Sequence, residues 1–400
     1  MRFLYLSLNV PFPADNGHRM RTWSTLRALK AEGHETTLLC LAPDAAPDPD
    51  TVALKEGCDA FEVVLHASRP LSVSADYAGR LRALLAARPY TARRWSSPAL
   101  QARVASLLTA ERFDAAVCDT IFMTENVRSN SVPIIVNSPD VEHVVLARFL
   151  AHEHNPLRRA YATVELSKTR RWERTVCRRG ALVLAASATD QDVLETLCPE
   201  TRVAVLPNVI DIEHYAPAPN GDPSIILYSG GMDWYPNRDA VDYFARQVFP
   251  ALRRSFPNLR FRVAGRASDA FRQHFIGMAG VEFTGYVPDM RVEIARAGLC
   301  VVPIRIGSGT RLKILEAAAM SKAIVSTSVG AEGLDFVDGS EIVLADGPAA
   351  LVGAVTVLLG DPARRRSLGQ AARRRVEASY GTTALQQALS ASLAGWGMGS

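Results

Sequence analysis

The chain has 400 residues, more than one hydrophobic core ordinarily serves, so we expect two domains of about 200 residues each. Hydrophobic residues make up 48% and charged residues 22%, values that exclude a disordered or fibrous protein. The net charge of +4 is too small to indicate nucleic-acid binding, and it is compatible with an anionic ligand or an anionic membrane surface.

The cysteines and the N-terminus predict a cytoplasmic protein. The six cysteines form no C-x-x-C pair, which is typical of small core residues in a reducing compartment. The apolar run after Arg2 resembles a signal peptide, but it ends at Pro11 and no small-residue cleavage site follows. A buried first strand of a parallel sheet fits this run better. No apolar run approaches the ~20 residues that span a membrane.

The first half of the chain alternates short apolar runs with longer helical patterns. We expect a strand over residues 3–10, a loop over 11–17, a helix over 18–32 and a strand over 36–41. This order is typical of a doubly wound parallel sheet. Further elements are expected in the same half: strands over 115–119, 133–137 and 182–186, and a basic helix over 157–179.

A turn-rich passage over residues 207–223 indicates a domain boundary. After it the pattern restarts with a strand over 224–229 that ends in Gly230 and Gly231. The remaining expected elements are helices over 237–256 and 310–321, strands over 260–264, 299–303 and 323–326, and a strand with a turn over 281–288. Two successive halves of this kind predict a bilobal α/β protein.

The most informative segment, residues 301–320, reads as a buried strand, a glycine-rich loop and a helix. Exposed amides at a helix N-terminus, close to Arg311 and Lys313, suit a diphosphate. Glu316 shares a helix face with Lys313, so its carboxylate can accept hydrogen bonds from ribose hydroxyls while the cation neutralises phosphate. Arg311 and Lys313 are about 200° apart on a helix, so we expect only one, preferably Lys313, to reach the phosphates. The alternative is a flexible helix entry with a solvated Lys–Glu pair.

This segment resembles the signature of the retaining glycosyltransferases of family four, in Ile314-Leu315-Glu316-Ala317 and in the strand that follows. Further similar segments are 207–211, 263–266, 283–289, 380–383 and the loop 230–237, the last resembling a bacterial exopolysaccharide-associated branch. The resemblance implies the GT-B fold, two facing Rossmann-like domains with the active site in the cleft between them. It also implies an acceptor-side domain (1–206), a nucleotide-sugar-binding domain (207–376) and a helix returning to the first domain (377–400).

The chain departs from the family pattern at two places. The first glutamate of the family's usual pair is replaced by Ser308, so recognition of the transferred sugar must differ. The Arg and Lys that commonly hold the diphosphate are also absent, and Gly231 and Asn237-Arg238 stand near their positions. We therefore expect Arg311 or Lys313 to supply the missing positive charge.

Two segments of the first half carry further candidate residues. Gly17 and Arg19 lie in the loop that approaches the donor phosphate in the family, although the alternative is an ordinary surface loop. Asp140 and His143 follow the strand over 133–137, where His143 could orient a hydroxyl group or transfer a proton. The alternative for Asp140 is a structural role as a helix N-cap.

The basic helix over 157–179 holds eight basic and two acidic residues. It could dock on anionic lipid headgroups, or it could be a solvated Arg-rich helix. Two acidic pairs, Asp48 with Asp50 and Asp190 with Asp192, lie in a loop and at a helix start, so we do not expect either to bind a metal ion.

We therefore predict a metal-independent, retaining hexosyltransferase that moves a sugar from a nucleoside diphosphate sugar to a glycan or lipid-linked acceptor, in bacterial surface polysaccharide or glycoconjugate synthesis. The alternatives are a nucleotide-sugar epimerase of the same fold and a non-catalytic nucleotide-sugar-binding protein. The resemblance assigns catalysis to His143, Asp140, Lys313 and Arg311. The expected donor-binding residues are Gly17, Arg19, Gly230, Gly231, Arg266, Val287, Gly307, Ser308, Gly309, Thr310 and Glu316.

Overall fold

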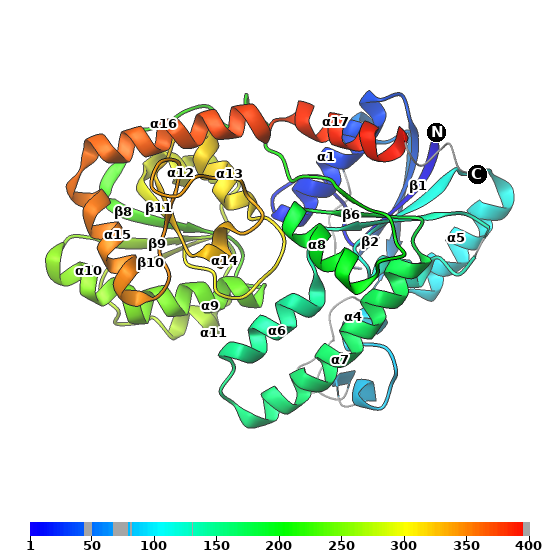
Figure 1. The fold of residues 1–400 in the computed structure, drawn as a ribbon, viewed down its shortest axis with the longest axis horizontal. Coiled ribbons are helices and arrows are strands. Elements are labelled where there is room, and N and C mark those ends of the chain that lie inside the picture. The colour runs from blue at the N-terminus through cyan, green and yellow to red at the C-terminus, as the bar shows by residue number, and fades with distance from the viewer. Residues whose placement is uncertain (44–49, 67–78, 81, 130, 395–400) are drawn as a thin grey trace. The chain divides into compact units, whose positions relative to one another are not determined.

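The computed structural model describes residues 1–43, 50–66, 79–80, 82–129 and 131–394. The chain divides into two compact units, each a parallel sheet with helices packed on it (Figure 1). Unit 1 comprises Met1–Pro207 and Leu385–Ser400, and unit 2 comprises Asn208–Ala384. The two Rossmann-like sheets that the sequence predicts are therefore present.

In its described part, the sheet of unit 1 has the strand order β3-β2-β1-β4-β5-β6-β7. Its strands are β1 (Arg2–Ser7), β2 (Glu35–Ala42), β3 (Ala60–Leu65), β4 (Ala115–Asp119), β5 (Ile134–Ser138), β6 (Leu182–Ala185) and β7 (Val203–Val205). Its described helices are α1 (Gly17–Ala31), α2 (Thr51–Gly57), α4 (Tyr90–Arg94), α5 (Pro98–Ala110), the short η1 (Met123–Asn126), α6 (Glu142–His152), α7 (Pro156–Arg179), α8 (Ala188–Leu197) and most of α17 (Thr382–Ala394).

Strand β1 lies at the centre of this sheet and pairs in parallel with β2 on one side and β4 on the other. Its residues after Arg2 are buried, as are all residues of β4, because helices cover both faces of a parallel sheet. The chain moves outward from β1 to β2 and β3 and then crosses to β4, so the strand order reverses between β1 and β4. The carboxyl ends of these two strands, Ser7 and Asp119, therefore lie at a topological switch point, where ligands bind in such sheets.

In its described part, the sheet of unit 2 has the order β10-β9-β8-β11-β12-β13, which reverses in the same way between β8 and β11. Its strands are β8 (Asp222–Ser229), β9 (Arg260–Ala264), β10 (Val281–Gly285), β11 (Ala297–Val302), β12 (Ile324–Ser326) and β13 (Val343–Leu344). Its helices are α9 (Tyr235–Tyr243), the π-helix η2 (Phe244–Val248), α10 (Phe249–Ser255), α11 (Asp269–Gln273), α12 (Met290–Arg296), α13 (Leu312–Ala319), α14 (Ser328–Ala331), α15 (Pro348–Gly360) and α16 (Pro362–Ser379).

The expected elements are present, with two corrections in unit 2. The helix predicted over 237–256 is interrupted by the π-helical turn η2, because Pro250 lacks the N–H that a continuous α-helix would need there. The helix predicted from residue 310 begins at Leu312, with Arg311 in an extended conformation as its N-cap. The strand predicted over 3–10 also ends early, at Ser7.

Two residues of the acidic pairs, Asp50 and Asp190, take part in helix caps. Asp50 caps α2 by accepting hydrogen bonds from the amides of Val52 and Ala53, and Asp48 lies outside the described residues. Ser187 caps α8 by accepting a hydrogen bond from the amide of Asp190. Within the described residues, helices that combine the length and the apolar character needed to cross a bilayer are absent.

Gly369 of α16 packs against the backbone of Ser321, just after the end of α13. A Cβ atom at Gly369 would lie 2.0 Å from the backbone oxygen of Ser321, which cannot move aside as a side chain would. We expect Gly369→Ala to lower the free energy of unfolding of unit 2 by about 1–3 kcal/mol because of overpacking. Gly353, inside α15, has no neighbour within 4 Å of such a Cβ, so Gly353→Ala should instead stabilise by about 0.5–1 kcal/mol. Urea unfolding measures both, and equal effects would contradict this account of the contact.

Candidate functional site

Three loops follow strands β8, β9 and β11 in unit 2, and each needs a glycine. Gly230, Gly265 and Gly307 have φ of 140°, 138° and 150°, which residues with a side chain rarely adopt. A Cβ atom at Gly265 would lie 2.2 Å from the carbonyl oxygen of Gly230. The glycines thus let the loops at the carboxyl edge of the sheet approach one another closely.

Lys313, on the first turn of α13, extends to the loop after β8. Its Nζ donates a hydrogen bond of 2.9 Å to Oδ1 of Asn237 and lies 4.0 Å from the centre of the Tyr228 ring. A Cβ atom at Gly230 would lie 2.9 Å from Nζ, so the glycine leaves room for the cation. Burial and the neighbouring Arg311 lower the pKa of Lys313 to about 7, although Glu316 opposes this shift.

Asn237 fixes the position of the Lys313 ammonium group. Its Oδ1 also accepts a hydrogen bond of 2.6 Å from the hydroxyl of Tyr228, and its Nδ2 donates one of 2.8 Å to the carbonyl of Gly231. The buried amide therefore ties strand β8, the glycine loop and α13 together. The sequence marked this position as one where a family cation is missing, and here an amide holds a cation that comes from α13.

Arg311 lies beside Lys313 and not on the opposite side of the helix. Because Arg311 is the N-cap, with φ of −96° and ψ of 100°, helical spacing does not apply to it. Its guanidinium donates a hydrogen bond to the carbonyl of Ser308 and lies 5.6 Å from the centre of the Trp234 ring. A Cβ atom at Gly307 would lie 2.1 Å from Nη2. The expectation that the two cations point apart was therefore wrong, because both lie at the glycine loops.

Glu316 lies one turn after Lys313 and accepts a hydrogen bond of 2.9 Å from the hydroxyl of Tyr215 on Oε1. Burial raises the pKa of Glu316, while the Tyr215 hydrogen bond and the charge of Lys313 act in the opposite direction. Nearby, Nδ2 of Asn208 donates a hydrogen bond of 2.8 Å to Oγ1 of Thr310 in the loop before α13. The segment that opens unit 2 thus supports both the loop and the carboxylate.

Arg266 and Val287 lie at the ends of β9 and β10. The Arg266 guanidinium is 4.5 Å from the centre of the exposed Tyr286 ring, next to Val287. The backbone carbonyl of Arg266 accepts a hydrogen bond of 2.7 Å from the amide of Met232, which links this pair to the loop after β8. Eleven of the predicted residues lie in unit 2: Gly230, Gly231, Arg266, Val287, Gly307, Ser308, Gly309, Thr310, Arg311, Lys313 and Glu316.

In unit 1, Gly17 begins α1 and Arg19 lies in its first turn. Arg19 forms an ion pair of 2.9 Å with Asp15, and its amide donates a hydrogen bond to the N-cap Asn16. The ion pair holds the Arg19 side chain against the loop between β1 and α1. Gly17 and Arg19 thus lie at the carboxyl edge of the sheet, on the side of the switch point.

His143, in the first turn of α6, is held by Glu173 of α7. The fully buried Glu173 carboxylate accepts hydrogen bonds from the amide of Glu142 (2.9 Å) and from Nδ1 of His143. The N-cap of α6 is Val141 and has no side-chain cap hydrogen bond. The structural alternative for Asp140 as the N-cap was therefore wrong, because a carboxylate from the neighbouring helix caps α6 instead.

A buried polar network lies at the switch point of unit 1. The Asp119 carboxylate accepts hydrogen bonds from the hydroxyl of Thr22 and from Nδ2 of Asn137 (3.0 Å). Asn137 in turn accepts a hydrogen bond of 2.9 Å from Nε of the buried Arg21. Nε2 of His18 lies 3.3 Å from the same carboxylate. His18 lies between the predicted Gly17 and Arg19, and the network thus adjoins both residues.

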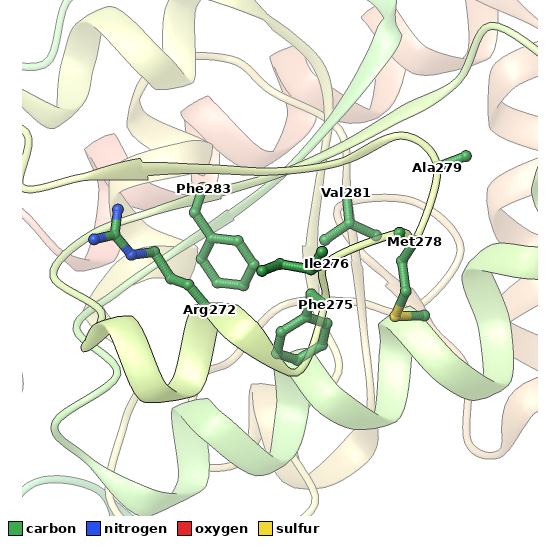
Figure 2. Close-up of a pocket in the computed structure, with 8 residues that line it drawn as sticks. Arg272, Phe275, Ile276, Met278, Ala279, Val281 and Phe283 are labelled. Carbon is green, nitrogen blue, oxygen red and sulfur yellow. The ribbon is translucent and has the colours of Figure 1, made fainter.

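Residues that the structure describes form a cavity in each unit. One of about 430 Å³, between α11 and β10, is lined by Arg272, Phe275, Ile276, Gly277, Met278, Ala279, Val281 and Phe283 (Figure 2). Its side chains are apolar except Arg272, which is paired with Asp269, so it is unsuited to a diphosphate. The other, of about 250 Å³, is lined by His143, Arg170, Asp192, Val193, Thr196 and Leu197. Only the second adjoins a predicted site residue.

Several residues of the candidate sites were missed in the sequence. The missed residues that contact predicted ones are Tyr215, Asn208, Tyr228 and Glu173. Asn208 and Thr310 are 102 positions apart along the chain, and Tyr215 and Glu316 are 101 positions apart. A single sequence carries no signal that pairs such positions. Asn237 was noted only as a departure from the family pattern, and its contact with Lys313 depends on the fold.

Two family models match the chain in succession. The model described as Glycosyltransferase Family 4 matches residues 16–214, and the model described as Glycosyl transferases group 1 matches residues 223–361. Together they cover more than four-fifths of the chain. An uncharacterized 44.6 kDa protein in the cps region of Klebsiella pneumoniae is 19% identical over 359 residues, which are 86% of this chain and 87% of that protein.

Solved structures show the same fold. Sucrose-phosphate synthase from Thermosynechococcus elongatus matches with a TM-score of 0.74 at 17% identity, covering 100% of both chains. HepE of Anabaena in complex with UDP and glucose matches with a TM-score of 0.67 at 14% identity, covering 98% of this chain and 99% of that chain. The two Rossmann-like units thus have the GT-B fold that the sequence predicts.

Proposed function

Because the chain belongs to the GT-B glycosyltransferases, we propose that it transfers a hexose from a nucleoside diphosphate sugar to an acceptor hydroxyl group with retention of the anomeric configuration. The observation that carries the proposal is the pair of cations at the carboxyl edge of unit 2. Lys313 and Arg311 lie against the glycine loops after β8 and β11, where backbone amides and the N-terminus of α13 favour an anion.

The diphosphate would occupy this edge. Departure of a nucleoside diphosphate leaves negative charge on its oxygens, and preorganised donors stabilise that charge more in the transition state than in the bound donor. Lys313 is held by Asn237 and Tyr228, so little reorganisation is needed during the reaction. We therefore assign the electrostatic stabilisation of the leaving group to Lys313 and Arg311, without a metal ion.

Glu316 would bind the ribose. Its Oε1 is occupied by the Tyr215 hydroxyl, which leaves Oε2 to accept hydrogen bonds from ribose hydroxyls. The Arg266–Tyr286 pair lies on neighbouring strand ends and offers a flat surface on which a nucleobase can stack. The HepE complex contains UDP, so UDP is the first donor nucleotide to test.

The acceptor would bind to unit 1, where His143 borders the cavity of about 250 Å³. Because Glu173 binds Nδ1 of His143, Nε2 is the nitrogen left for a substrate hydroxyl. Asp140 would be a second catalytic residue, together with His143. We propose a glycan or lipid-linked acceptor in bacterial surface polysaccharide synthesis, supported by the resemblance of the loop 230–237 and by the relative from the cps region.

We also propose that α7 associates with the cytoplasmic face of the membrane. Some of its cations support the fold: Arg159, Lys168 and Arg179 donate hydrogen bonds to backbone carbonyls. The exposed Arg170, Arg171 and Arg174 form no ion pair with the described residues. Charges of this kind favour an anionic lipid surface.

Thermal unfolding with UDP, GDP, dTDP, CDP or NAD tests the donor site. A nucleoside diphosphate that binds only the folded state should stabilise it by about 2.7 kcal/mol at 100 times its Kd. We expect one nucleoside diphosphate to raise the Tm, and Glu316→Ala and the isosteric Glu316→Gln to abolish the shift. The exposed Glu213→Ala is the matched control and should keep it. Stabilisation by NAD alone would contradict the proposal.

With a sugar donor, NMR of the product should then show retention of the anomeric configuration, whereas an epimerised donor would identify an epimerase.

The pH dependence of nucleoside diphosphate affinity tests Lys313. With a pKa of about 7 in the free protein, Lys313 loses its charge as the pH rises above 7, whereas a bound anion favours the charged form. Binding therefore takes up a proton, and we expect affinity to fall by up to about tenfold per pH unit between pH 7 and 9. Lys313→Arg keeps its charge and should remove this slope, and calorimetry in buffers of different ionisation enthalpy measures the proton uptake. A wild-type affinity that is constant over this range would rule out the assigned role.

Sedimentation with vesicles tests the membrane proposal. We expect binding to phosphatidylglycerol-containing vesicles but not to phosphatidylcholine vesicles, and weaker binding as salt is added. Replacing Arg170, Arg171 and Arg174 by Gln should weaken binding by about 100-fold, since each basic residue contributes about 1 kcal/mol. Replacing the exposed Arg364, Arg366 and Arg374 by Gln removes the same charge from α16 and should have little effect. Equal loss in both triple variants would show that net charge, not α7, is responsible.

A further inference from the structure

The buried carboxylate of Asp119 lies at the carboxyl end of β4, with an exposed fraction of 0%. It accepts hydrogen bonds from the hydroxyls of Thr22 and Ser7 and from Nδ2 of Asn137. The charge is balanced within the fold, because Asn137 links the carboxylate to the buried Arg21 guanidinium. These groups satisfy Asp119 without any further partner.

His18 also contacts this carboxylate, and part of its ring is exposed to solvent. Nε2 of His18 lies 3.3 Å from Oδ2 of Asp119 and is itself buried; it forms no hydrogen bond with the described residues, so its contact with the carboxylate is electrostatic. The His18 side chain is nevertheless 21% exposed, so the imidazole reaches the surface through its other atoms. A buried carboxylate on one ring nitrogen and solvent at the rest of the ring is an arrangement that orients an imidazole toward a ligand.

The position of the pair in the fold also indicates a ligand site. His18 belongs to the first turn of α1, which follows β1, and Asp119 ends β4. The strand order reverses between β1 and β4, and ligands of open parallel sheets bind at such a switch point, outside the carboxyl ends of the strands. Gly17, directly before His18, adds no side chain that would cover the ring.

The chemistry of the pair selects the kind of group that it binds. A carboxylate oxygen repels a nitrogen lone pair and attracts an N–H group, so the tautomer that suits Asp119 carries its proton on Nε2. Nδ1 then presents a lone pair, which accepts a hydrogen bond from a hydroxyl group. In the function proposed above the acceptor binds to unit 1, so we assign this hydroxyl group to the acceptor.

We propose that His18 binds a hydroxyl group of the acceptor through Nδ1, and that Asp119 is the positioning residue that fixes the tautomer and orientation of His18. The proposal rests on the glycosyltransferase function proposed above. It adds an acceptor contact at the switch point of unit 1, apart from the His143 side chain.

The first test is the tautomer of His18 in the free protein. ¹⁵N NMR of histidine-labelled protein, assigned by comparison with His18→Gln, should show a protonated Nε2 and an unprotonated Nδ1. In Asp119→Asn the amide no longer fixes the tautomer, so we expect a mixture of the two forms. A proton on Nδ1 in the wild type would overturn the proposal, whatever the protein transfers.

The second test separates acceptor binding from donor binding. With UDP-glucose and a panel of octyl glycosides, His18→Gln and Asp119→Asn should raise the KM for the acceptor by about tenfold, the equivalent of one hydrogen bond. The KM for the donor and the Tm shift with UDP should stay unchanged. His34→Gln makes the same substitution in unit 1, in the turn between α1 and β2 and away from the carboxyl ends of the strands, so it is the control that should leave both KM values unchanged.

An unchanged acceptor KM in a folded His18→Gln, or an equal rise in both KM values, would overturn the proposal. Failure of the glycosyltransferase function has a different signature. In that case the wild type binds none of the nucleoside diphosphates and transfers no sugar, while the tautomer experiment still decides how His18 is held.

Discussion

The hydrogen bond between Lys313 and Asn237 is the contact on which the arrangement of unit 2 depends. It places an ammonium group from α13 against the loop that follows β8, and it requires that Gly230 have no side chain, since a Cβ atom there would lie 2.9 Å from Nζ. Asn237 also binds the Tyr228 hydroxyl and the Gly231 carbonyl, so strand, loop and helix share one buried amide.

The two units carry different chemical groups at the same place in their sheets. In each, the strand order reverses beside a central strand, and polar side chains gather at the carboxyl ends on either side of the reversal. Unit 2 gathers cations and glycines, which suit an anion. Unit 1 gathers a carboxylate, an amide and histidine, which suit hydroxyl groups. In the proposed function these groups would be complementary to the two kinds of substrate, a diphosphate donor and a hydroxyl acceptor, because the loops and not the strands carry the chemistry.

The sequence predicts local features of this fold well and distant contacts poorly. Buried strands such as β4 are visible as apolar runs, and the glycines before α13 mark the loop. Arg311 was misplaced because a helix boundary is uncertain by a residue or two, and one residue decides whether helical spacing applies. The cap of α6 was also misassigned, because the sequence shows Asp140 nearby but cannot show that Glu173, 31 positions from Glu142, reaches the same amides. Tyr215 and Glu316 meet across 101 positions, which only the packed sheet brings together.

The ionisable groups of α13 explain why such a site would be both stable without substrate and effective with it. Burying Lys313 beside Arg311 costs free energy, and the lowered pKa of Lys313 expresses that cost. Asn237, the Tyr228 ring and Glu316 offset part of it, since each interacts favourably with a cation. A bound diphosphate would remove the remainder by supplying the missing negative charge. In the proposed reaction this charge grows as the sugar departs, so the unfavourable burial of cations in the free protein becomes stabilisation of the transition state.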